Sequence, residues 1–181
     1  DYLRTDMLFC RLAYGFIPSE YAGFELENKT PEQRREFASD IDMNVFGYSV
    51  NDIKELQSIL DKGDGYLRFS NYFKRDAIVI KNKGDYAQFH EFVKKHPIFV
   101  KKVVFSSMGK GVELVNINEI SENEKDYFEK LVSTGKYLLE EKVCQHEEMA
   151  KFNKSSVNTI RCITFKTDKG VETPYAFMRA G

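Results

Sequence analysis

Residues 99–115 read FVKKVVFSSMGKGVELV, and this stretch decides the fold of the region around it. Two runs of strand-forming residues flank a loop at residues 106–111, which contains two serines, two glycines and a lysine. A Walker A loop would need glycine at 104 and serine or threonine at 111, but the chain has Val104 and Gly111. A dinucleotide-binding loop would need a third glycine, where Leu114 stands, and a helix after it. The stretch therefore predicts a strand, a polar loop and a second strand.

The polar loop has two open interpretations. Its glycines and serines would let backbone N–H groups approach an anion, and Lys101 and Lys110 bracket it with positive charge. Lys101 also stands among apolar strand residues, where a solvated lysine is less expected. The alternative is an ordinary flexible hairpin with its lysines in solvent. The spacing of these residues alone leaves both interpretations open.

Composition limits the class of protein. The chain has 181 residues, of which 42% are hydrophobic and 14% aromatic, so it can form a core in one domain or two small lobes. A net charge of −1 lacks the basic footprint of a nucleic-acid-binding protein. No apolar run predicts a transmembrane helix or a signal peptide. Three widely spaced cysteines predict neither a disulfide framework nor a zinc site, and we expect a cytoplasmic protein. The first residue is Asp, and the last ones follow a predicted strand, which suggests a fragment.

The pattern of elements changes near residue 65. Residues 1–65 read as helical, with a capping box that begins at Thr30. Strands, helices and hairpins then alternate, which indicates an α+β fold. A second capping box is expected at Ser121. Pro174 indicates that the last strand is interrupted or lies at a sheet edge. Strands are predicted at residues 77–81, 98–105, 111–115, 137–143, 157–166 and 171–179.

The strand at residues 137–143 becomes polar at its end. Glu140 and Glu141 lie there, and Glu147 follows. The exposed backbone of a strand end can read the edge of an adenine, and a later carboxylate can accept hydrogen bonds from ribose hydroxyls. The alternative is an ordinary acidic turn between a strand and a helix. The sequence leaves both interpretations open.

Two arginines interrupt strand-forming runs near the end of the sequence. Arg161 follows Asn158 on one strand, and Arg179 stands on the next strand of the predicted hairpin. Guanidinium groups beside a phosphate loop suit bidentate contacts with an anionic substrate. The alternative is a pair of edge-strand arginines in surface ion pairs.

Taken in order, these segments resemble the ATP-grasp superfamily. The arginine strands resemble the paired-arginine hairpin of ribosomal-protein-modifying glutamate ligases, with Asn158 in place of an acidic residue. More narrowly, three segments resemble the sugar-transfer-associated ATP-grasp family, which is linked to bacterial capsule and exopolysaccharide biosynthesis. These segments are YGFIPSEY at 14–21, the helical segment at 30–37 and SVNTIR at 156–161, and the resemblance spans most of residues 10–181.

The resemblance implies an ATP-grasp-like two-lobe fold of class α+β with an incomplete second lobe. The expected parts are a helical segment at 1–65, a first lobe with the glycine-rich hairpin at 66–136 and the start of a second lobe at 137–181. ATP and Mg²⁺ are the implied cofactors, with no metal ligand among these residues and the Mg²⁺ ligands expected beyond residue 181. The extra first-lobe lysine of these enzymes has no clear place, with Lys74 and Lys81 as candidates.

The resemblance also assigns site residues. The phosphate-binding residues would be Lys101, Ser106, Ser107, Gly109, Lys110 and Gly111. Glu140, Glu141 and Val143 would hold the adenine, and Glu147 the ribose. Arg161 and Arg179 would be the catalytic pair, acting on the transferring phosphate or the acyl-phosphate.

The function implied is that of an ATP-dependent carboxylate–amine or carboxylate–thiol ligase, active at full length. Its partners would be a nucleotide and a carboxylate-bearing small molecule or sugar or polymer precursor. The alternative is a non-catalytic nucleotide- or polymer-binding module with the same fold.

Overall fold

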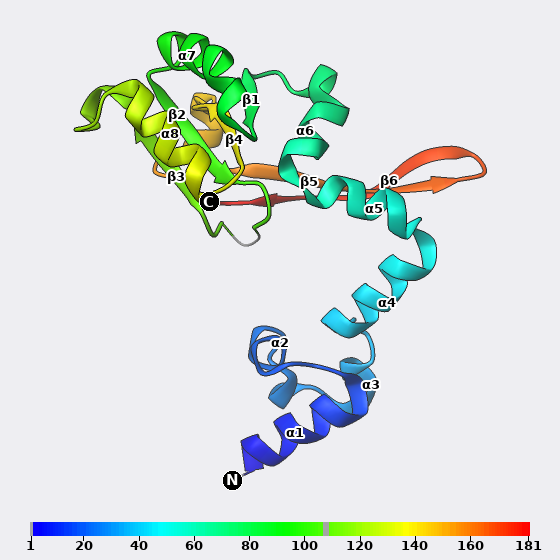
Figure 1. Cartoon of the computed structure of the whole chain (residues 1–181). Coiled ribbons are helices and arrows are strands. Elements are labelled where there is room, and N and C mark those ends of the chain that lie inside the picture. Colours follow the sequence, from blue (N-terminus) through cyan, green and yellow to red (C-terminus); the bar gives the residue numbers. More distant parts are fainter. Residues whose placement is uncertain (1, 107–108) are drawn as a thin grey trace. The chain divides into compact units, whose positions relative to one another are not determined.

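The computed structural model describes residues 2–106 and 109–181 (Figure 1). Ser107 of the predicted phosphate loop therefore lies outside the described residues. The chain divides into two compact units, Asp1–Asp61 and Lys62–Gly181. The first unit is helical and the second is mixed, so the chain is an α+β protein.

The first unit is built from short helices. The predicted capping box at Thr30 is confirmed, because its hydroxyl accepts from the Gln33 backbone N–H and the Gln33 side chain accepts from the Thr30 N–H. Gly15 ends the first helix with φ of 81°, a left-handed conformation that favours glycine. The helices are α1 (Tyr2–Tyr14), α2 (Pro18–Gly23), α3 (Pro31–Arg34), α4 (Asp40–Val50) and α5 (Ile53–Leu60).

A buried ion pair holds the N-terminal helices together. Arg34 donates from its two terminal nitrogens to the two carboxylate oxygens of Asp6, each at 2.8 Å. The Tyr21 hydroxyl donates to the same carboxylate at 2.6 Å, and Arg34 Nε donates to the Leu26 carbonyl at 2.9 Å. Cys10 and Phe16 pack beside this network in the small apolar core. The fork of Arg34 thus joins α1 to the segment that contains Leu26.

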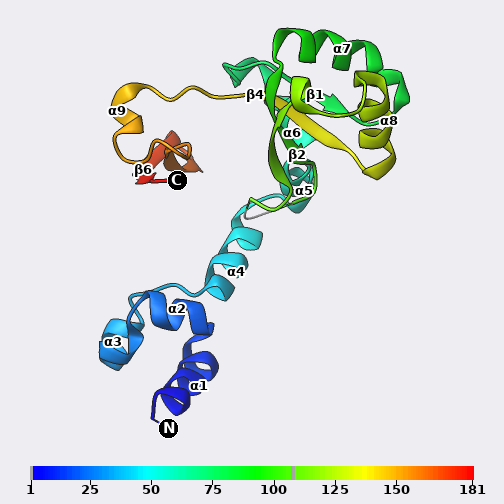
Figure 2. The same cartoon turned by 90° about the vertical axis from the view of Figure 1, so that its left-hand side faces the viewer.

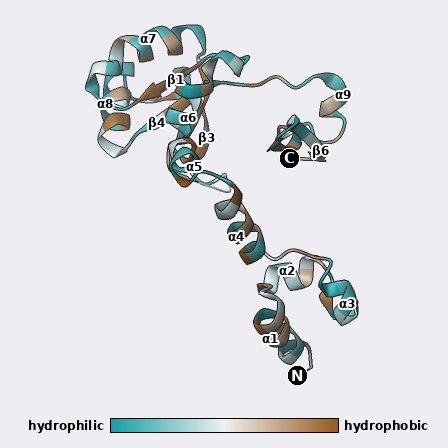
Figure 3. Cartoon of the chain, turned by 90° about the vertical axis from the view of Figure 1, so that its right-hand side faces the viewer, coloured by the Kyte–Doolittle hydropathy of each residue, from teal (hydrophilic) through white to brown (hydrophobic). Residues whose placement is uncertain are grey.

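The second unit contains a four-stranded antiparallel sheet with the order β1-β4-β2-β3. β1 is strongly hydrophobic (Figure 3). Helices α7 and α8 cover one face of this sheet (Figure 1). The helices are α6 (Lys62–Phe69), α7 (Tyr86–Lys95) and α8 (Glu124–Thr134), and the strands are β1 (Ala77–Ile80), β2 (Ile98–Val103), β3 (Val112–Asn116) and β4 (Tyr137–Glu141).

The core lies between the sheet and these two helices. Phe89 of α7, Phe128 of α8 and Phe99 of β2 are almost fully buried there. Burying each of these side chains contributes about 1.5–3 kcal/mol. Helix α8 begins later than predicted: its N-cap is Asn123, whose side chain accepts from the Asp126 N–H, so the capping box expected at Ser121 is a wrong prediction.

β4 lies in the middle of the sheet, between β1 and β2, rather than apart from them. The resemblance placed the start of a second lobe at residues 137–181, and that division stays a prediction. Tyr137, Leu138 and Leu139 are all buried, so both faces of the strand are covered at this point. A continuous apolar run of this kind is typical of a strand that is covered on both faces, whereas a strand with one solvated face alternates.

After β4 the chain runs as an extended segment to the short helix α9 (Glu147–Ala150) (Figure 2). It then forms a hairpin of β5 (Thr159–Thr167) and β6 (Gly170–Arg179), as predicted. A register shift between Ile163 and Phe165 lies across from Pro174, which supplies no N–H to the ladder. β6 is continuous through that proline, and both strands of this two-stranded sheet are edges.

Candidate functional site

The face of the sheet away from α7 and α8 borders a cavity of about 770 Å³, which we call the open-face cavity. Its volume falls within the range of small-molecule sites. Four basic and two acidic side chains line it, so its charge favours an anion. The cavity is lined by Arg75, Val100, Lys102, Val112, Leu114, Glu140, Glu141, Lys142, Val143, Cys144, Gln145, Ala150, Lys154, Ser155, Ser156, Val157 and Thr159.

A buried carboxylate with two cations lies at the centre of this wall. Glu140 Oε2 accepts from Lys102 Nζ at 2.7 Å and from Arg75 Nε at 3.0 Å. The Glu140 side chain is only 6% exposed, whereas Arg75 is 29% and Lys102 24% exposed. The carboxylate is therefore covered, and each cation keeps contact with the cavity.

The pKa of Glu140 reflects this arrangement. Burial alone would raise the pKa of the carboxyl group, because a buried charge loses its hydration. Hydrogen bonds from Arg75 and Lys102, together with their positive charges, outweigh burial and hold the pKa below its usual value. Glu140 is thus ionised at neutral pH, and it keeps both cations in place.

Unpaired main chain follows directly after Glu141. Residues 142–144 form no backbone hydrogen bond with any other described residue, although they lie at the end of a central strand. Val100, Val112, Leu114 and Val143 give this part of the cavity an apolar wall. Of the adenine-binding residues predicted from the sequence, Glu140, Glu141 and Val143 all line the open-face cavity. A flat heterocycle with polar edges matches an apolar wall beside free N–H and C=O groups.

Lys101 lies on the opposite face of the sheet from this cavity. Its ammonium group is 2.8 Å from Glu113 Oε2 and 5.4 Å from the centre of the Tyr137 ring, on the side of α7 and α8. Successive strand residues point to opposite faces, so Lys102 and not Lys101 shares a face with Val100. The sequence predicted Lys101 as the phosphate-binding lysine, and the structure places Lys102, but not Lys101, in the wall of the open-face cavity.

The glycine-rich loop connects β2 and β3 and is tied to the first helix of the same unit. Lys62 Nζ, at the start of α6, donates to the Val103 carbonyl at 3.3 Å and to Ser106 Oγ at 2.9 Å, and it also contacts the Ser106 carbonyl. Gly109 and Gly111 have φ of 76° and 69°, so both use the left-handed conformation that favours glycine. The Gly109 carbonyl accepts from the N–H of Val112 at 3.3 Å, whereas Lys110 is exposed. No local sequence pattern points to Lys62 as the lysine that holds this loop.

The two arginines of the hairpin lie on one of its faces. Arg179 is opposite Thr159, and Arg161 is opposite Phe177, so the arginines are diagonal neighbours. Thr159 lies on the same face and lines the open-face cavity. Both arginines are exposed, and among the described residues neither guanidinium has an ion-pair partner. Glu147 is exposed at the start of α9 and is not part of the cavity wall.

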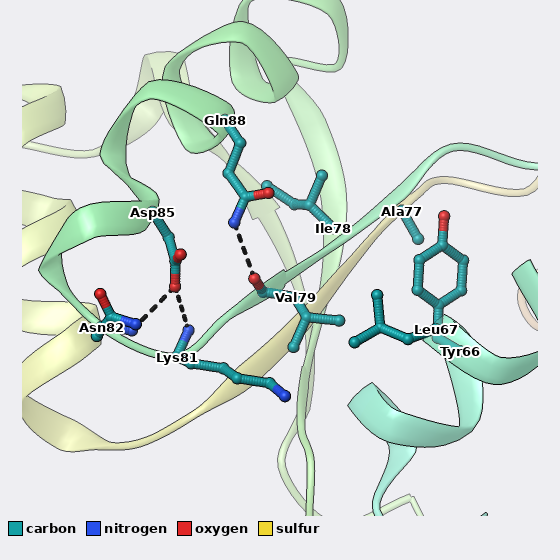
Figure 4. A pocket seen from close by; sticks show the side chains of 9 residues that line it. All are labelled: Tyr66, Leu67, Ala77, Ile78, Val79, Lys81, Asn82, Asp85 and Gln88. Atoms are coloured by element: carbon teal, nitrogen blue, oxygen red, sulfur yellow. Dashed lines mark hydrogen bonds between the residues drawn. The ribbon is translucent and has the colours of Figure 1, made fainter.

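A second cavity, of about 320 Å³, lies beside β1 (Figure 4). Its polar groups are used locally: Asp85 accepts from the backbone N–H groups of Lys81 and Asn82, and Gln88 donates to the Val79 carbonyl. Lys81 pairs with Asp64 at 3.0 Å. Because Asp85, Gln88 and Lys81 are engaged in these contacts, this cavity is a weaker candidate than the open-face cavity.

The comparisons with known proteins place most of the chain in one family. Residues 49–181, well over half of the chain, match the model of the sugar-transfer associated ATP-grasp family. No curated protein and no solved structure gives a significant match. Within the described residues, every helix is too short or too polar to cross a membrane.

Proposed function

The chain belongs to the sugar-transfer associated ATP-grasp family, and from this premise we propose that the open-face cavity binds ATP. The family implies nucleotide binding in general, and the cavity supplies the local chemistry. The supporting observation is a pair of cations, Arg75 and Lys102, held on buried Glu140 beside unpaired strand-end backbone.

Arg75 and Lys102 would bind the phosphates. An ammonium group has three donors and a guanidinium has five, and each uses only one of them on Glu140. The remaining N–H groups can donate to phosphate oxygens without breaking the contact with the carboxylate. Glu140 thus acts as a positioning residue, because it fixes both cations before the nucleotide arrives.

The base would lie against the apolar wall. Val100, Leu114 and Val143 cover its faces, and the main chain of residues 142–144 offers donors and acceptors to its edge. We propose Glu147 for the ribose hydroxyls. The loop at residues 106–111 would close over the triphosphate, with Ser106, Ser107, Gly109, Lys110 and Gly111 as its contacts.

ATP bound there would supply its γ-phosphoryl group to a substrate carboxylate, giving an acyl-phosphate from which an amine or thiol displaces phosphate. Mg²⁺ would accompany the triphosphate. Arg161 and Arg179 would orient the carboxylate and neutralise charge on the transferring group, because they share a face with Thr159 at the cavity. We also propose that the chain divides into a helical segment at 1–65, a first lobe at 66–136 and the start of a second lobe at 137–181.

The family's link with sugar transfer suggests the substrate class. We propose a carboxylate-bearing sugar or polymer precursor of bacterial capsule or exopolysaccharide synthesis as the acceptor. Binding of Mg·ATP without release of ADP or phosphate would instead favour a non-catalytic binding module.

Calorimetry with Mg·ATP tests the proposal. Wild type should bind, and Arg75→Gln should bind about tenfold more weakly, because a charge-assisted hydrogen bond contributes roughly 1.5–3 kcal/mol. Arg68→Gln is the matched control, since Arg68 lies outside the cavity wall. Equal affinity of wild type and Arg75→Gln would reject the cavity as the nucleotide site.

A further inference from the structure

Three potential metal ligands meet at one edge of the sheet, outside the groups assigned to the nucleotide phosphates. Asp76 directly precedes β1, His96 directly follows α7, and Glu141 ends β4. One ligand atom from each of these side chains lies within 4.8 Å of the other two. Segments distant in the sequence therefore bring one imidazole and two carboxylates together.

The fold fixes the positions of all three groups. The Glu141 N–H donates to the Asp76 carbonyl at 2.9 Å, and the Asp76 N–H donates to Glu141 Oε2 at 2.8 Å. The His96 N–H donates to the Phe92 carbonyl at 2.8 Å, and the two rings pack with centroids 5.0 Å apart. This reciprocal pairing and ring packing hold the three side chains near one point without any ion.

The distances suit a transition-metal ion. His96 Nε2 lies 2.9 Å from Asp76 Oδ2 and 3.8 Å from Glu141 Oε2. Tetrahedral zinc holds N and O ligands at about 2.0–2.2 Å, which places the ligand atoms about 3.4 Å from one another. Small side-chain rotations would bring the three atoms to that separation.

We propose that Asp76, His96 and Glu141 form a binding site for a divalent transition-metal ion of the zinc type. One imidazole nitrogen and two carboxylate oxygens are a donor set that zinc accepts. The side chains of Asp76 and Glu141 are 46% and 33% exposed, so water can supply the remaining ligand. The ion would tie the end of α7 to β4 immediately next to Glu140.

Lys95 occupies the position of a competing cation. Its ammonium group contacts Asp76 Oδ2, the same oxygen that faces His96. A metal ion must displace this lysine, which remains largely solvent-exposed at 68%. Removal of the lysine should therefore strengthen metal binding. If the three side chains form only a structural ion-pair cluster, removal of the lysine would leave the affinity for metal unchanged.

Titration with Zn²⁺ against a chelating indicator dye tests the site in the full chain. His96→Gln should weaken Zn²⁺ binding about tenfold or more, and Lys95→Ala should strengthen it severalfold. His90→Gln is the matched control, since His90 pairs with Glu124 at 2.8 Å but has no third ligand among the described residues. Unchanged affinity in His96→Gln, or equal loss in His90→Gln, would overturn the proposal.

Two further measurements distinguish this site from zinc binding at a cysteine and from loss of the fold. Co²⁺ in place of zinc should give a spectrum without thiolate charge-transfer bands; their presence would assign binding to the exposed Cys144 or Cys162 and overturn the proposal. His96→Gln should retain the wild-type circular dichroism spectrum and Mg·ATP affinity, which shows a folded protein with only the metal site lost. If His96→Gln unfolds, Asp76→Asn replaces it as the test of zinc affinity. The same tenfold loss is expected, and an unchanged affinity would overturn the proposal.

Discussion

Lys101 and Lys102 are adjacent in the chain, but their ammonium groups lie on opposite faces of one sheet. Lys101 pairs with Glu113 at 2.8 Å on the helix-covered face, and Lys102 pairs with buried Glu140 at 2.7 Å on the open face. The period of two in a β-strand is the cause, since each step along the strand reverses the direction of the side chain. The two lysines therefore have different opportunities to meet a ligand.

This arrangement predicts different effects of two matched substitutions. Lys102→Met should weaken Mg·ATP binding about tenfold, because it removes a charge-assisted donor from the cavity. Lys101→Met should leave the affinity within about twofold, because its ammonium group lies on the other face. Calorimetry on both variants measures the difference. A larger loss in Lys101→Met would place the nucleotide on the helix-covered face and would support the role that the sequence predicted for Lys101.

Lys62 should control the glycine-rich loop. Lys62→Met removes the donor to the Val103 carbonyl and Ser106, so the loop loses its connection to α6. We expect faster amide hydrogen exchange in the end of β2 and weaker Mg·ATP binding. Lys125→Met is the control, because Lys125 is exposed on α8 and lies outside the cavity wall. If the amides at the end of β2 exchange at the same rate in the two variants, Lys62 does not hold the loop in place.

The two loop glycines should differ in their tolerance of alanine. A Cβ at Gly111 would lie 2.7 Å from Val103 Cγ2, whereas a Cβ at Gly109 would meet no atom within 4 Å among the described residues other than its chain neighbours. Both positions have positive φ, which costs an alanine roughly 1–2 kcal/mol. Gly111→Ala should therefore destabilise the protein by about 2–3 kcal/mol and Gly109→Ala by about 1 kcal/mol. Urea unfolding of both variants measures this order, and equal losses would contradict the packing of Val103 on Gly111.

Acid should weaken the helical unit through Asp6. Its hydrogen bonds from Arg34 lower the pKa of the carboxyl group in the folded protein, against the opposing effect of burial. A depressed folded pKa gives stability that is fully present above the unfolded pKa, about 3.9, and is lost as pH falls through the folded pKa. Unfolding of the N-terminal unit should therefore need less urea below about pH 4.

Asp6→Asn tests that dependence. It should cost about 3 kcal/mol at neutral pH, because it leaves the Arg34 charge buried without its partner. The variant should also lose part of the acid dependence, since residue 6 no longer titrates. Urea unfolding followed by circular dichroism from pH 3 to pH 7 measures both effects. If the free energy of unfolding of the variant depends on pH as steeply as that of the wild type, Asp6 is not the titrating group.

Local sequence signals predicted much of the fold. The capping box at Thr30, the hairpin on either side of the glycine-rich loop and the turn before Gly170 all depend on short-range chemistry, and the structure has them. The predicted start of α8 was wrong because two nearby residues, Ser121 and Asn123, both suit an N-cap. Short-range patterns do not decide between neighbouring caps of similar strength.

The site could be predicted only in part, because it depends on pairing between distant strands. Glu140, Glu141 and Val143 follow from a strand that ends in polar residues. Arg75 and Glu140 are 65 positions apart in the sequence, and no local pattern predicts their contact. Strand parity separates Lys102 from the face of Phe99, but only the structure shows that Phe99 faces the core, so the sequence could not choose between Lys101 and Lys102.

The buried amide of Asn158 has a consequence for how the protein folds. Its Nδ2 donates to the Met149 carbonyl at 2.8 Å and to Gln145 Oε1 at 3.0 Å, and its Oδ1 accepts from the Gly181 N–H at 3.0 Å. One side chain thus connects Gln145 and Met149, which precede the β5–β6 hairpin, to Gly181, which follows it. Every residue of β5 and β6 is exposed, so breaking these hydrogen bonds uncovers little new apolar surface. We therefore expect the hairpin to open as a separate unit with a shallow denaturant slope, and the hydrogen bonds of Asn158 to set the free energy of that opening.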